Sequence, residues 1–355
     1  MKSNRYLIFI LFAVLILSIS AVNATEIDLD DNLTTFNLNN QVATASVTST
    51  PDKTWTVEYF LSNYNQISSG ETILIKNGTG TVTNQMTLSK SKVSIITEGN
   101  VILNSDGGNH RCFYVTGSDI LIQGITFQNF QNNDGGGAIY WQGINGVLKN
   151  CNFNNNKALE GGSPGGGIYW YGYDGTLFAC TFTNNYAMYG GGVYWGLERG
   201  SLFACTFTNN IAKYYGGGCY WSTIDCNLFA CTFTNNTADM FGGGFCMNGG
   251  IVSDCNFKAN TASTMGGAIH TFSKSSVINC NFINSEWINK QSKTNGIGCR
   301  NNLTINNGNG IVDISFEKSY TQFLSGISII VLNNKTIECS SNTNINFVNN
   351  VLNYA

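Results

Sequence analysis

The middle of the chain repeats one pattern of apolar and polar positions. The phrase GGGIYW is followed by a variable turn and by LFACTFTNNYA at residues 165–187, and close copies follow at residues 190–212 and 216–238. Weaker copies flank them, so the clearest repeats span residues 135–286. One cysteine marks each copy, and successive marker cysteines lie 24 to 29 residues apart: Cys151, Cys180, Cys205, Cys231, Cys255 and Cys280. The chain is therefore built from a unit of about 25 residues.

Each unit holds two β-rich runs joined by Asn and Gly turns, and none shows an apolar period of 3.6 residues. Such a short unit cannot bury its apolar face alone, but stacking pairs each strand in parallel with its equivalent one turn away. The repeats therefore predict an all-β, single-stranded parallel β-helix. A propeller fits less well, because its blades need about 40 to 45 residues each.

Less regular segments extend the predicted β-helix over residues 51–299. Residues 55–67 form an amphipathic helical pattern, and we expect a short N-terminal helical cap there because an open β-helix end presents unpaired strand edges. Residues 25–50 have little apolar pattern and are predicted to be a flexible leader. Beyond the repeats, residues 300–355 are predicted to form irregular final coils or a C-terminal cap.

The first 24 residues have the features of a secretory signal peptide. Lys2 and Arg5 precede an apolar run at residues 7–19, and small residues lead to a cleavage site near Ala24. A retained membrane anchor is the alternative, but it needs about 20 apolar residues to cross a bilayer. We therefore expect a secreted or extracellular cell-surface protein with no membrane span after signal removal.

Strand alternation predicts the core of each coil. In LFACTFTNN, Phe178, Cys180 and Phe182 should point inward and the threonines outward. The tryptophan of GGGIYW shares the inward parity, although its size also suits a corner. Stacked coils would then give one column of phenylalanines: Phe153, Phe182, Phe207, Phe233, Phe257 and Phe282.

Two polar features are predicted to be structural. The Asn pair that ends each copy should occupy a corner, where Asn tolerates left-handed backbone and like amides can hydrogen-bond along the stack. The Gly triplets should mark bends too tight for a Cβ atom. A phosphate-binding loop is the alternative for these triplets, but it needs a following helix, and a strand follows here.

The twelve cysteines of the chain allow two interpretations. Export favours disulfides, and neighbouring coils bring equivalent cysteines close enough to bridge, although parallel Cβ vectors suit a bridge poorly. Buried free thiols are the other interpretation. No CxxC pair occurs and no His adjoins a Cys, so we predict neither a metal site nor a cofactor.

Charge argues against one class of partner. Only 11% of the residues are charged and the net charge is −3, so no basic surface for nucleic acid is expected.

Outward-facing tyrosines are the candidate binding residues. By parity, the tyrosine of each GGGIYW copy points outward, and two further tyrosines lie at the adjoining turn. The predicted aromatic strip consists of Tyr140, Tyr169, Tyr194, Tyr220, Tyr189 and Tyr215. It would suit a glycan or a protein on another cell surface. The alternative is a ladder that merely stabilises neighbouring strands.

No catalytic arrangement is evident. The two histidines, His110 and His270, fall in different coils without a repeated Ser or Cys partner. Asp174, Glu198 and Asp225 share the turn after the aromatic strand and could form a carboxylate ridge, whereas other acidic residues fall at different phases. We therefore assign no catalytic residue and expect a protein that is not an enzyme.

The alternating motifs resemble those of known families. GGAI at residues 136–139 and 266–269, alternating with FxxN as at residues 153–156 and 182–185, resembles the repeats of chlamydial polymorphic outer membrane proteins. The chain is also similar to the adhesin-like surface proteins of methanogenic archaea, including their opening coils at residues 71–130. The resemblance implies a right-handed, pectin-lyase-like β-helix with a role in attachment, and it supplies no catalytic residues.

Three hypotheses for the function follow. The first is a secreted adhesin-like protein that binds glycans or another cell surface through a lateral face of the β-helix. The second is a secreted polysaccharide lyase or glycoside hydrolase on the same scaffold. The third is a purely structural envelope protein.

Overall fold

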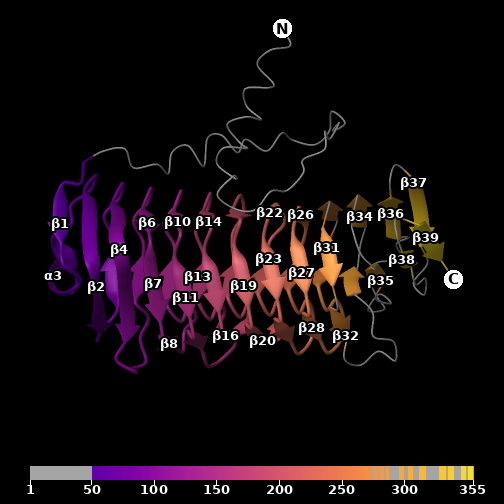
Figure 1. Cartoon of the computed structure of the whole chain (residues 1–355), viewed down its shortest axis with the longest axis horizontal. Coiled ribbons are helices and arrows are strands. Elements are labelled where there is room, and N and C mark those ends of the chain that lie inside the picture. Colours follow the sequence, from indigo (N-terminus) through magenta and orange to yellow (C-terminus); the bar gives the residue numbers. More distant parts are fainter. Residues whose placement is uncertain are drawn as a thin grey trace, which may run out of the picture. The chain divides into compact units, whose positions relative to one another are not determined.

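The computed structural model describes residues 50–273, 275–278, 280–283 and 285–287, followed by the backbone of separate strands up to residue 354. The predicted signal peptide, the predicted leader up to residue 49 and most of the predicted C-terminal segment lie outside the described residues. The described chain is a stack of β-coils of about eight turns (Figure 1). The parallel β-helix predicted from the repeats is confirmed.

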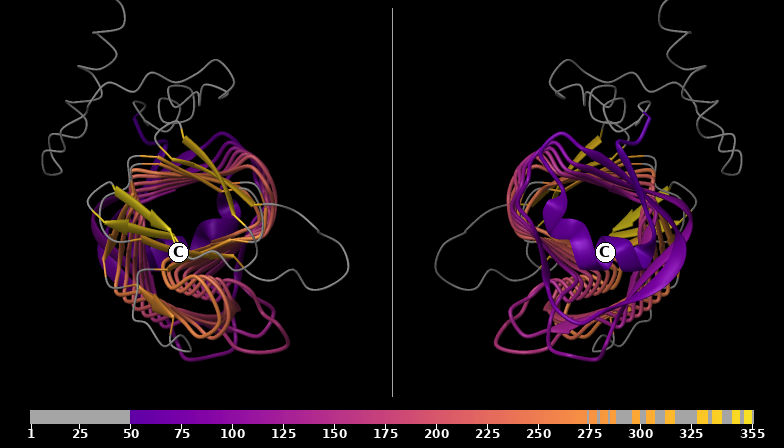
Figure 2. Two further views of the ribbon diagram at one scale, coloured as in Figure 1. Left: turned by 90° about the vertical axis from the view of Figure 1, so that its right-hand side faces the viewer. Right: turned by 90° about the vertical axis from the view of Figure 1, so that its left-hand side faces the viewer.

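Each coil contributes strands to three sheets, here called A, B and C. In one coil, β13 (Ile168–Trp170) lies in sheet B, β14 (Thr176–Phe178) and β15 (Thr181–Thr183) lie in sheet A, and β16 (Tyr186–Tyr189) lies in sheet C. Each strand pairs in parallel with its equivalent in the next coil, as in the register Phe182↔Phe207. Seen along the stack, the ribbons of successive coils superimpose (Figure 2).

The three sheets collect equivalent strands from along the chain. The further strands of sheet A are β1 (Lys53–Trp55), β2 (Thr72–Val82), β4 (Ser94–Ser105), β6 (Leu121–Gln123), β7 (Ile125–Gln128), β10 (Val147–Lys149), β11 (Asn152–Asn154), β18 (Ser201–Phe203), β19 (Thr206–Thr208), β22 (Cys226–Phe229), β23 (Thr232–Thr234), β26 (Gly250–Ser253), β27 (Asn256–Lys258), β30 (Ser275–Ile278), β31 (Asn281–Ile283), β34 (Leu303–Asn306), β36 (Ser328–Leu332) and β37 (Lys335–Cys339). Those of sheet B are β3 (Met86–Leu88), β5 (Phe113–Val115), β9 (Ile139–Trp141), β17 (Val193–Trp195), β21 (Cys219–Trp221), β25 (Phe245–Met247), β29 (Ile269–Thr271), β33 (Gly296–Cys299), β35 (Val312–Phe316), β38 (Ile345–Val348) and β39 (Val351–Tyr354). Those of sheet C are β8 (Gln131–Asn132), β12 (Lys157–Ala158), β20 (Ile211–Tyr215), β24 (Thr237–Ala238), β28 (Thr261–Ala262) and β32 (Glu286–Trp287). The last strands pair antiparallel, β36 with β37, β35 with β38 and β38 with β39, so the backbone pattern changes within residues 312–354.

A short helix covers the N-terminal end of the stack. The helix α3 (Val57–Asn63) is followed by a 3₁₀ turn, η1 (Tyr64–Gln66). Thr56 caps it, because its hydroxyl accepts a hydrogen bond from the backbone N–H of Tyr59. Phe60 is fully buried and meets the edge of the Phe113 ring at a centroid distance of 6.3 Å. The helix lies across the end of the coils, as the sequence predicted (Figure 2).

The aromatic core confirms most of the predicted columns. The six stacked phenylalanines have neighbouring ring centroids 4.6 to 5.3 Å apart. Beside them runs a column of fully buried tryptophans, with centroids 4.5 to 4.8 Å apart: Trp141, Trp170, Trp195 and Trp221. The tryptophans therefore occupy the core and not a corner.

The prediction that Phe178 points inward is wrong. Ala179 adopts a left-handed backbone with φ of 51°, which bends the chain between β14 and β15 and interrupts the strict alternation. As a result Leu177 is fully buried in the core and Phe178 is half-buried on the outer side. The equivalent residues Ala204 and Ala230 have the same left-handed backbone.

The corners behave as predicted. Asn184 has a left-handed backbone, and the buried amide of Asn185 donates from Nδ2 to Oδ1 of Asn210 at 2.9 Å. The row continues through buried equivalents in the coils on both sides: Asn156, Asn236 and Asn260. At the Gly triplet, a Cβ on Gly191 would lie 2.3 Å from the carbonyl oxygen of Gly217, so only glycine fits this bend.

The cysteines with described side chains are buried free thiols. All of them except Cys246 belong to the central core, and Cys180 donates from Sγ to the carbonyl oxygen of Leu148 in the preceding coil at 3.4 Å. Burial raises the pKa of Cys180 well above its ordinary value, because the thiolate would lose its hydration. These thiols therefore pack as small apolar side chains.

Candidate functional site

From β3 to β29, the middle position of each sheet B strand lies on the outer side of the sheet, and these positions form a continuous row, which we call the sheet B slot. From β5 to β21 the slot holds only tyrosine, in exact parallel register: Tyr114, Tyr140, Tyr169, Tyr194 and Tyr220. All five are half-buried. Together with two tyrosines of sheet C, Tyr189 and Tyr215, they make up a surface that we call the aromatic face.

The structure brings the six sequence-predicted tyrosines together. Tyr140 and Tyr169 stack with centroids 4.6 Å apart and an angle of 3° between their planes. From sheet C, Tyr189 and Tyr215 approach the ring of Tyr220 at 6.2 and 5.5 Å. The predicted residues therefore form one contiguous surface that spans two sheets.

This surface is less flat and less exposed than the row predicted from parity. The ring of Tyr194 stands nearly perpendicular to both neighbours, at 86° to Tyr169 and 82° to Tyr220. Partial burial raises the pKa values of the Tyr169 and Tyr220 phenols, and the neighbouring ionisable groups add to the effect. The phenols of these two residues therefore stay neutral and can donate hydrogen bonds at neutral pH.

At its C-terminal end the sheet B slot is closed. The positions that follow Tyr220 are Cys246 and His270, and both are fully buried. Phe241 stacks on the ring of His270 at 4.5 Å, and Phe272 meets the same ring edge-on at 4.5 Å. Within the described residues, the slot is therefore accessible over the tyrosines and covered at Cys246 and His270.

At the N-terminal end, polar groups join the aromatic face. The Tyr114 hydroxyl donates to Oε1 of Gln142 at 2.7 Å, and Nε2 of Gln142 donates to the Tyr140 hydroxyl at 2.8 Å. The guanidinium of Arg111 lies over the Tyr140 ring, 5.4 Å from its centroid. Sequence reasoning missed all three of Arg111, Tyr114 and Gln142; only Tyr114 has a signal, since it shares the parity of the later tyrosines.

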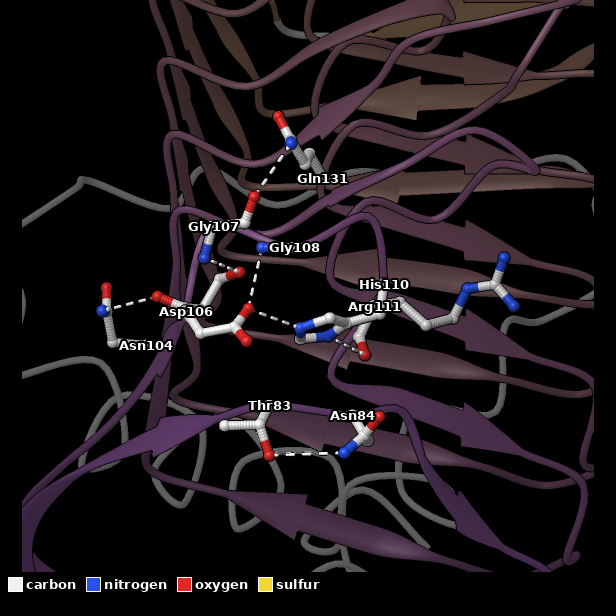
Figure 3. Close-up of polar contacts among 10 residues, drawn as sticks. Thr83, Asn84, Asn104, Asp106, Gly107, Gly108, His110, Arg111 and Gln131 are labelled. Atoms are coloured by element: carbon white, nitrogen blue, oxygen red, sulfur yellow. Dashed lines mark hydrogen bonds and ion pairs between the residues drawn. The ribbon is translucent and has the colours of Figure 1, made fainter.

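An acid–base pair lies on the loop between β4 and β5. His110 Nε2 is 2.8 Å from Oδ1 of Asp106, and that oxygen also accepts a hydrogen bond from the backbone N–H of Gly108 (Figure 3). These two bonds, with the Gly108 bond the larger effect, lower the pKa of Asp106. The other ring nitrogen faces the carbonyl oxygen of Arg111 at 3.3 Å. Both ring nitrogens thus face protein acceptors, and the Arg111 side chain points away from the pair (Figure 3).

The suggested carboxylate ridge does not form around Asp174. Arg199, from the next coil, binds both carboxylate oxygens of Asp174, at 2.7 and 2.8 Å. The side chain of Arg199 also lies over the Tyr173 ring, 5.1 Å from its centroid. In the part of the chain that the structure describes, no three His, Cys, Asp or Glu residues are placed to hold a metal ion.

Within the described residues, no helix has the length and apolar character needed to cross a membrane.

Comparison with known proteins gives the architecture alone. No protein-family model matches the sequence, and no curated protein sequence matches it. Among solved structures, the chain is similar to a PL6 alginate lyase in complex with a trisaccharide, with 17% identity and a TM-score of 0.37 over 72% of this chain. It is similar to pectate lyase Pel9A, with 15% identity and a TM-score of 0.42 over 80% of this chain and 75% of that one. It is also similar to an iota-carrageenase complexed to iota-carrageenan fragments, with 14% identity and a TM-score of 0.39 over 83% of this chain and 79% of that one. The chain spans 57% of the length of the alginate lyase.

These neighbours correct the expectation that the chain is not an enzyme. The solved structures similar to this chain include polysaccharide lyases and a galactohydrolase. The expectation was wrong because it rested on the lack of a repeated catalytic motif, and a site need not repeat along a solenoid. At 14 to 17% sequence identity, the similarity concerns the fold and does not extend to the activity of any one neighbour.

Proposed function

We propose that the chain binds an extended polysaccharide lengthwise along the aromatic face. The observation that carries this proposal is the row of half-buried tyrosines in the sheet B slot, one in each coil from β5 to β21. A tyrosine offers an apolar ring for the face of a sugar and a hydroxyl for its polar edge. Because consecutive coils are one strand spacing apart, about 4.8 Å, consecutive rings can meet consecutive sugars of an extended chain.

Polar groups beside the rings support the same proposal. Gln142 joins the hydroxyls of Tyr114 and Tyr140 in one hydrogen-bonded chain at the N-terminal end of the face. Carbohydrate recognition needs such fixed donors and acceptors next to apolar contact area, because they orient the ligand. A ladder that only stabilised the strands would not need a polar group at this position.

The biological setting is part of the proposal. The expected export signal and the resemblance to adhesin-like surface proteins of methanogenic archaea support a secreted or cell-surface protein that attaches to glycans or to another cell surface. The proposed aromatic face would serve as its contact surface.

A second candidate function is polysaccharide cleavage, which the arrangement of Arg111 beside two phenols supports. In a lyase, a base removes a proton next to a sugar carboxylate, the glycosidic oxygen leaves and a carbon–carbon double bond forms. Tyr114 and Tyr140 could act as the base that removes this proton and as the acid that protonates the leaving oxygen. The positive charge of Arg111 would stabilise the negative charge left by proton removal. Binding on the aromatic face is common to both candidates.

The test is binding of the mature chain to a panel of neutral and acidic polysaccharides, repeated with the double substitution Tyr169→Ala and Tyr194→Ala. We expect binding by the unchanged protein and a loss of about tenfold or more in the variant, since two aromatic contacts are removed. The matched control is Tyr59→Ala, which removes a tyrosine of 48% exposure on α3, away from the aromatic face. Binding to no member of the panel, or an equal loss in the control, would contradict the proposal.

The same samples separate the two candidate functions. Lyase action produces an unsaturated sugar that absorbs ultraviolet light, whereas hydrolysis produces only new reducing ends. Binding without either product supports the attachment function, and either product supports cleavage.

A further inference from the structure

Arg111 is a buried charge without a charged partner. Only 6% of the residue is exposed, and its Nε atom is buried with no hydrogen-bond partner. Buried arginines are usually paired with carboxylates. In the described part of the chain, the four ion pairs involve other residues, and no carboxylate lies within 4 Å of this guanidinium.

Neutral groups hold the side chain in place. Its Nη1 donates to Oε1 of Gln85 at 3.1 Å, and Nη2 donates to Oδ1 of Asn132 at 2.6 Å and to the carbonyl oxygen of Gly135 at 3.0 Å. These acceptors orient the guanidinium but do not cancel its charge. Burial lowers the pKa of Arg111, while the more distant Asp134 acts in the opposite direction. Arginine nevertheless stays protonated in proteins.

The charge lies at one end of the aromatic face. The guanidinium is over the Tyr140 ring, 5.4 Å from its centroid, and it comes from the loop that leads into the strand of Tyr114. A buried charge is screened less by salt than an exposed one, because the protein around it has a low dielectric constant. The positive field of Arg111 therefore reaches the surface where Tyr114, Tyr140 and Gln142 meet.

Arg199 shows what the neutralised arrangement looks like in the same protein. It also lies over a tyrosine, with its guanidinium 5.1 Å from the centroid of the Tyr173 ring. Its side chain is 56% exposed, however, and it binds Asp174 through two hydrogen bonds. Of the two stacked arginines, only Arg111 has a charge that a ligand could still neutralise.

We infer that Arg111, Tyr114, Tyr140 and Gln142 form an anion subsite at the N-terminal end of the aromatic face. Its ligand is the carboxylate or sulfate group of an acidic sugar, so the polysaccharide bound by the face is an acidic one. This inference rests on the proposed function and adds the chemical class of the ligand. The competing explanation is that Arg111 only ties its loop to Gln85 and Asn132.

The experiment compares two ligands that differ only in charge. An oligouronate and its carboxyl-reduced product have the same backbone, and a sulfated oligosaccharide with its desulfated product forms the second pair. We expect the unchanged protein to bind one acidic member about tenfold more tightly than its neutral counterpart, and the preference should fall only slightly as salt concentration rises, because the buried guanidinium is weakly screened. The pair that shows the preference identifies the anionic group.

Substitutions then assign the preference to one residue. Arg111→Gln should remove the preference for the acidic member and leave affinity for the neutral member within about twofold, which also shows that the variant is folded. Arg111→Lys should keep part of the preference, because the charge remains. Arg199→Gln is the matched control and should keep the full preference, since that guanidinium is already paired.

The outcomes separate this inference from the proposed function. If the protein binds neutral and acidic members equally, the anion subsite is wrong and the aromatic face still stands. If Arg199→Gln removes the preference as strongly as Arg111→Gln, or if Arg111→Gln is folded and keeps it, the assignment to Arg111 is wrong. If no oligosaccharide of either pair binds, the proposed function itself fails. Should Arg111→Gln not fold, Arg111→Lys decides the question: a reduced preference for the acidic member supports the assignment to Arg111, and a full preference contradicts it.

Discussion

The sheet B slot has two regions with the same strand pairing but different exposure of their outward side chains. Between Tyr114 and Tyr220 the outward side chains are half-buried tyrosines, whereas Cys246 and His270 are fully buried in the same register. The strands pair identically in both regions, so the scaffold does not decide which part is accessible. The difference comes from sheet C and its adjoining turns, where Phe241 and Met265 pack against Cys246 and close the slot. Access to the sheet B slot therefore depends on a few side chains that cover one part of the row and leave the tyrosines uncovered.

The first test removes the Phe241 ring, which covers the closed end of the sheet B slot. Phe241→Ala should lower the free energy of unfolding by about 3 kcal/mol, because a 4% exposed aromatic ring is removed from a packed cluster. The matched change on the open side, Tyr171→Ala, should cost less than about 1 kcal/mol, because that side chain is 42% exposed. Denaturant unfolding measures both values. Equal losses would mean that the two regions are packed alike.

The second test places a tyrosine in the closed region. Cys246→Tyr should lower the free energy of unfolding by about 2 kcal/mol, since the fully buried position has no room for a phenol ring. The conservative control is Cys246→Ala, which removes only the sulfur and should cost about 1 kcal/mol. If Cys246→Tyr were as stable as the unchanged protein, the closed end would be open to side chains of any size, and the contrast between the regions would disappear.

The third and smallest effect concerns alkaline pH. Burial raises the pKa values of Tyr169 and Tyr220 above the ordinary value of 10.0, so the folded state keeps their protons after the unfolded state has lost them. The stabilisation from these phenols is fully present below pH 10 and is lost progressively as the pH rises toward the raised values. Unfolding measured from pH 8 to pH 11, compared with Tyr220→Phe, should show a smaller alkaline loss in the variant. An identical loss in both proteins would show that the Tyr220 phenol titrates like an exposed one.

Features that repeat could be predicted from the sequence. Phe182 and Asn185 recur in every clear copy, so their stacking, their columns and the parallel fold follow from the period. The outward tyrosines were predicted in the same way, since parity within GGGIYW places Tyr169 opposite the buried Ile168 and Trp170. One copy gives only a weak prediction of which side chains point inward, but the prediction becomes strong because every copy gives the same one.

Features that occur once, or that depend on packing between sheets, could not be predicted. Ala179 has no side-chain property that marks a left-handed residue, so the bend that turns Phe178 outward has no local signal. Arg111 lies in a coil whose turn has no repeated equivalent, and its position over the Tyr140 ring follows only from the three-dimensional pairing of coils. The closure of the slot by Phe241 likewise depends on how sheet C folds back toward sheet B.

The buried asparagine row has a consequence for how this chain can change its length. From Asn156 to Asn236, each amide in the row donates to the amide one coil further on, as Asn185 donates to Asn210 and Asn210 donates to Asn236. The last amide of the row, Asn260, donates to the hydroxyl of Ser285. Removal of one complete repeat would leave each remaining donor facing an equivalent acceptor, whereas removal of part of a repeat would leave one amide without its match. Gain and loss of whole repeats is therefore the tolerated route, and a longer or shorter version of this protein would lengthen or shorten the aromatic face in steps of one tyrosine.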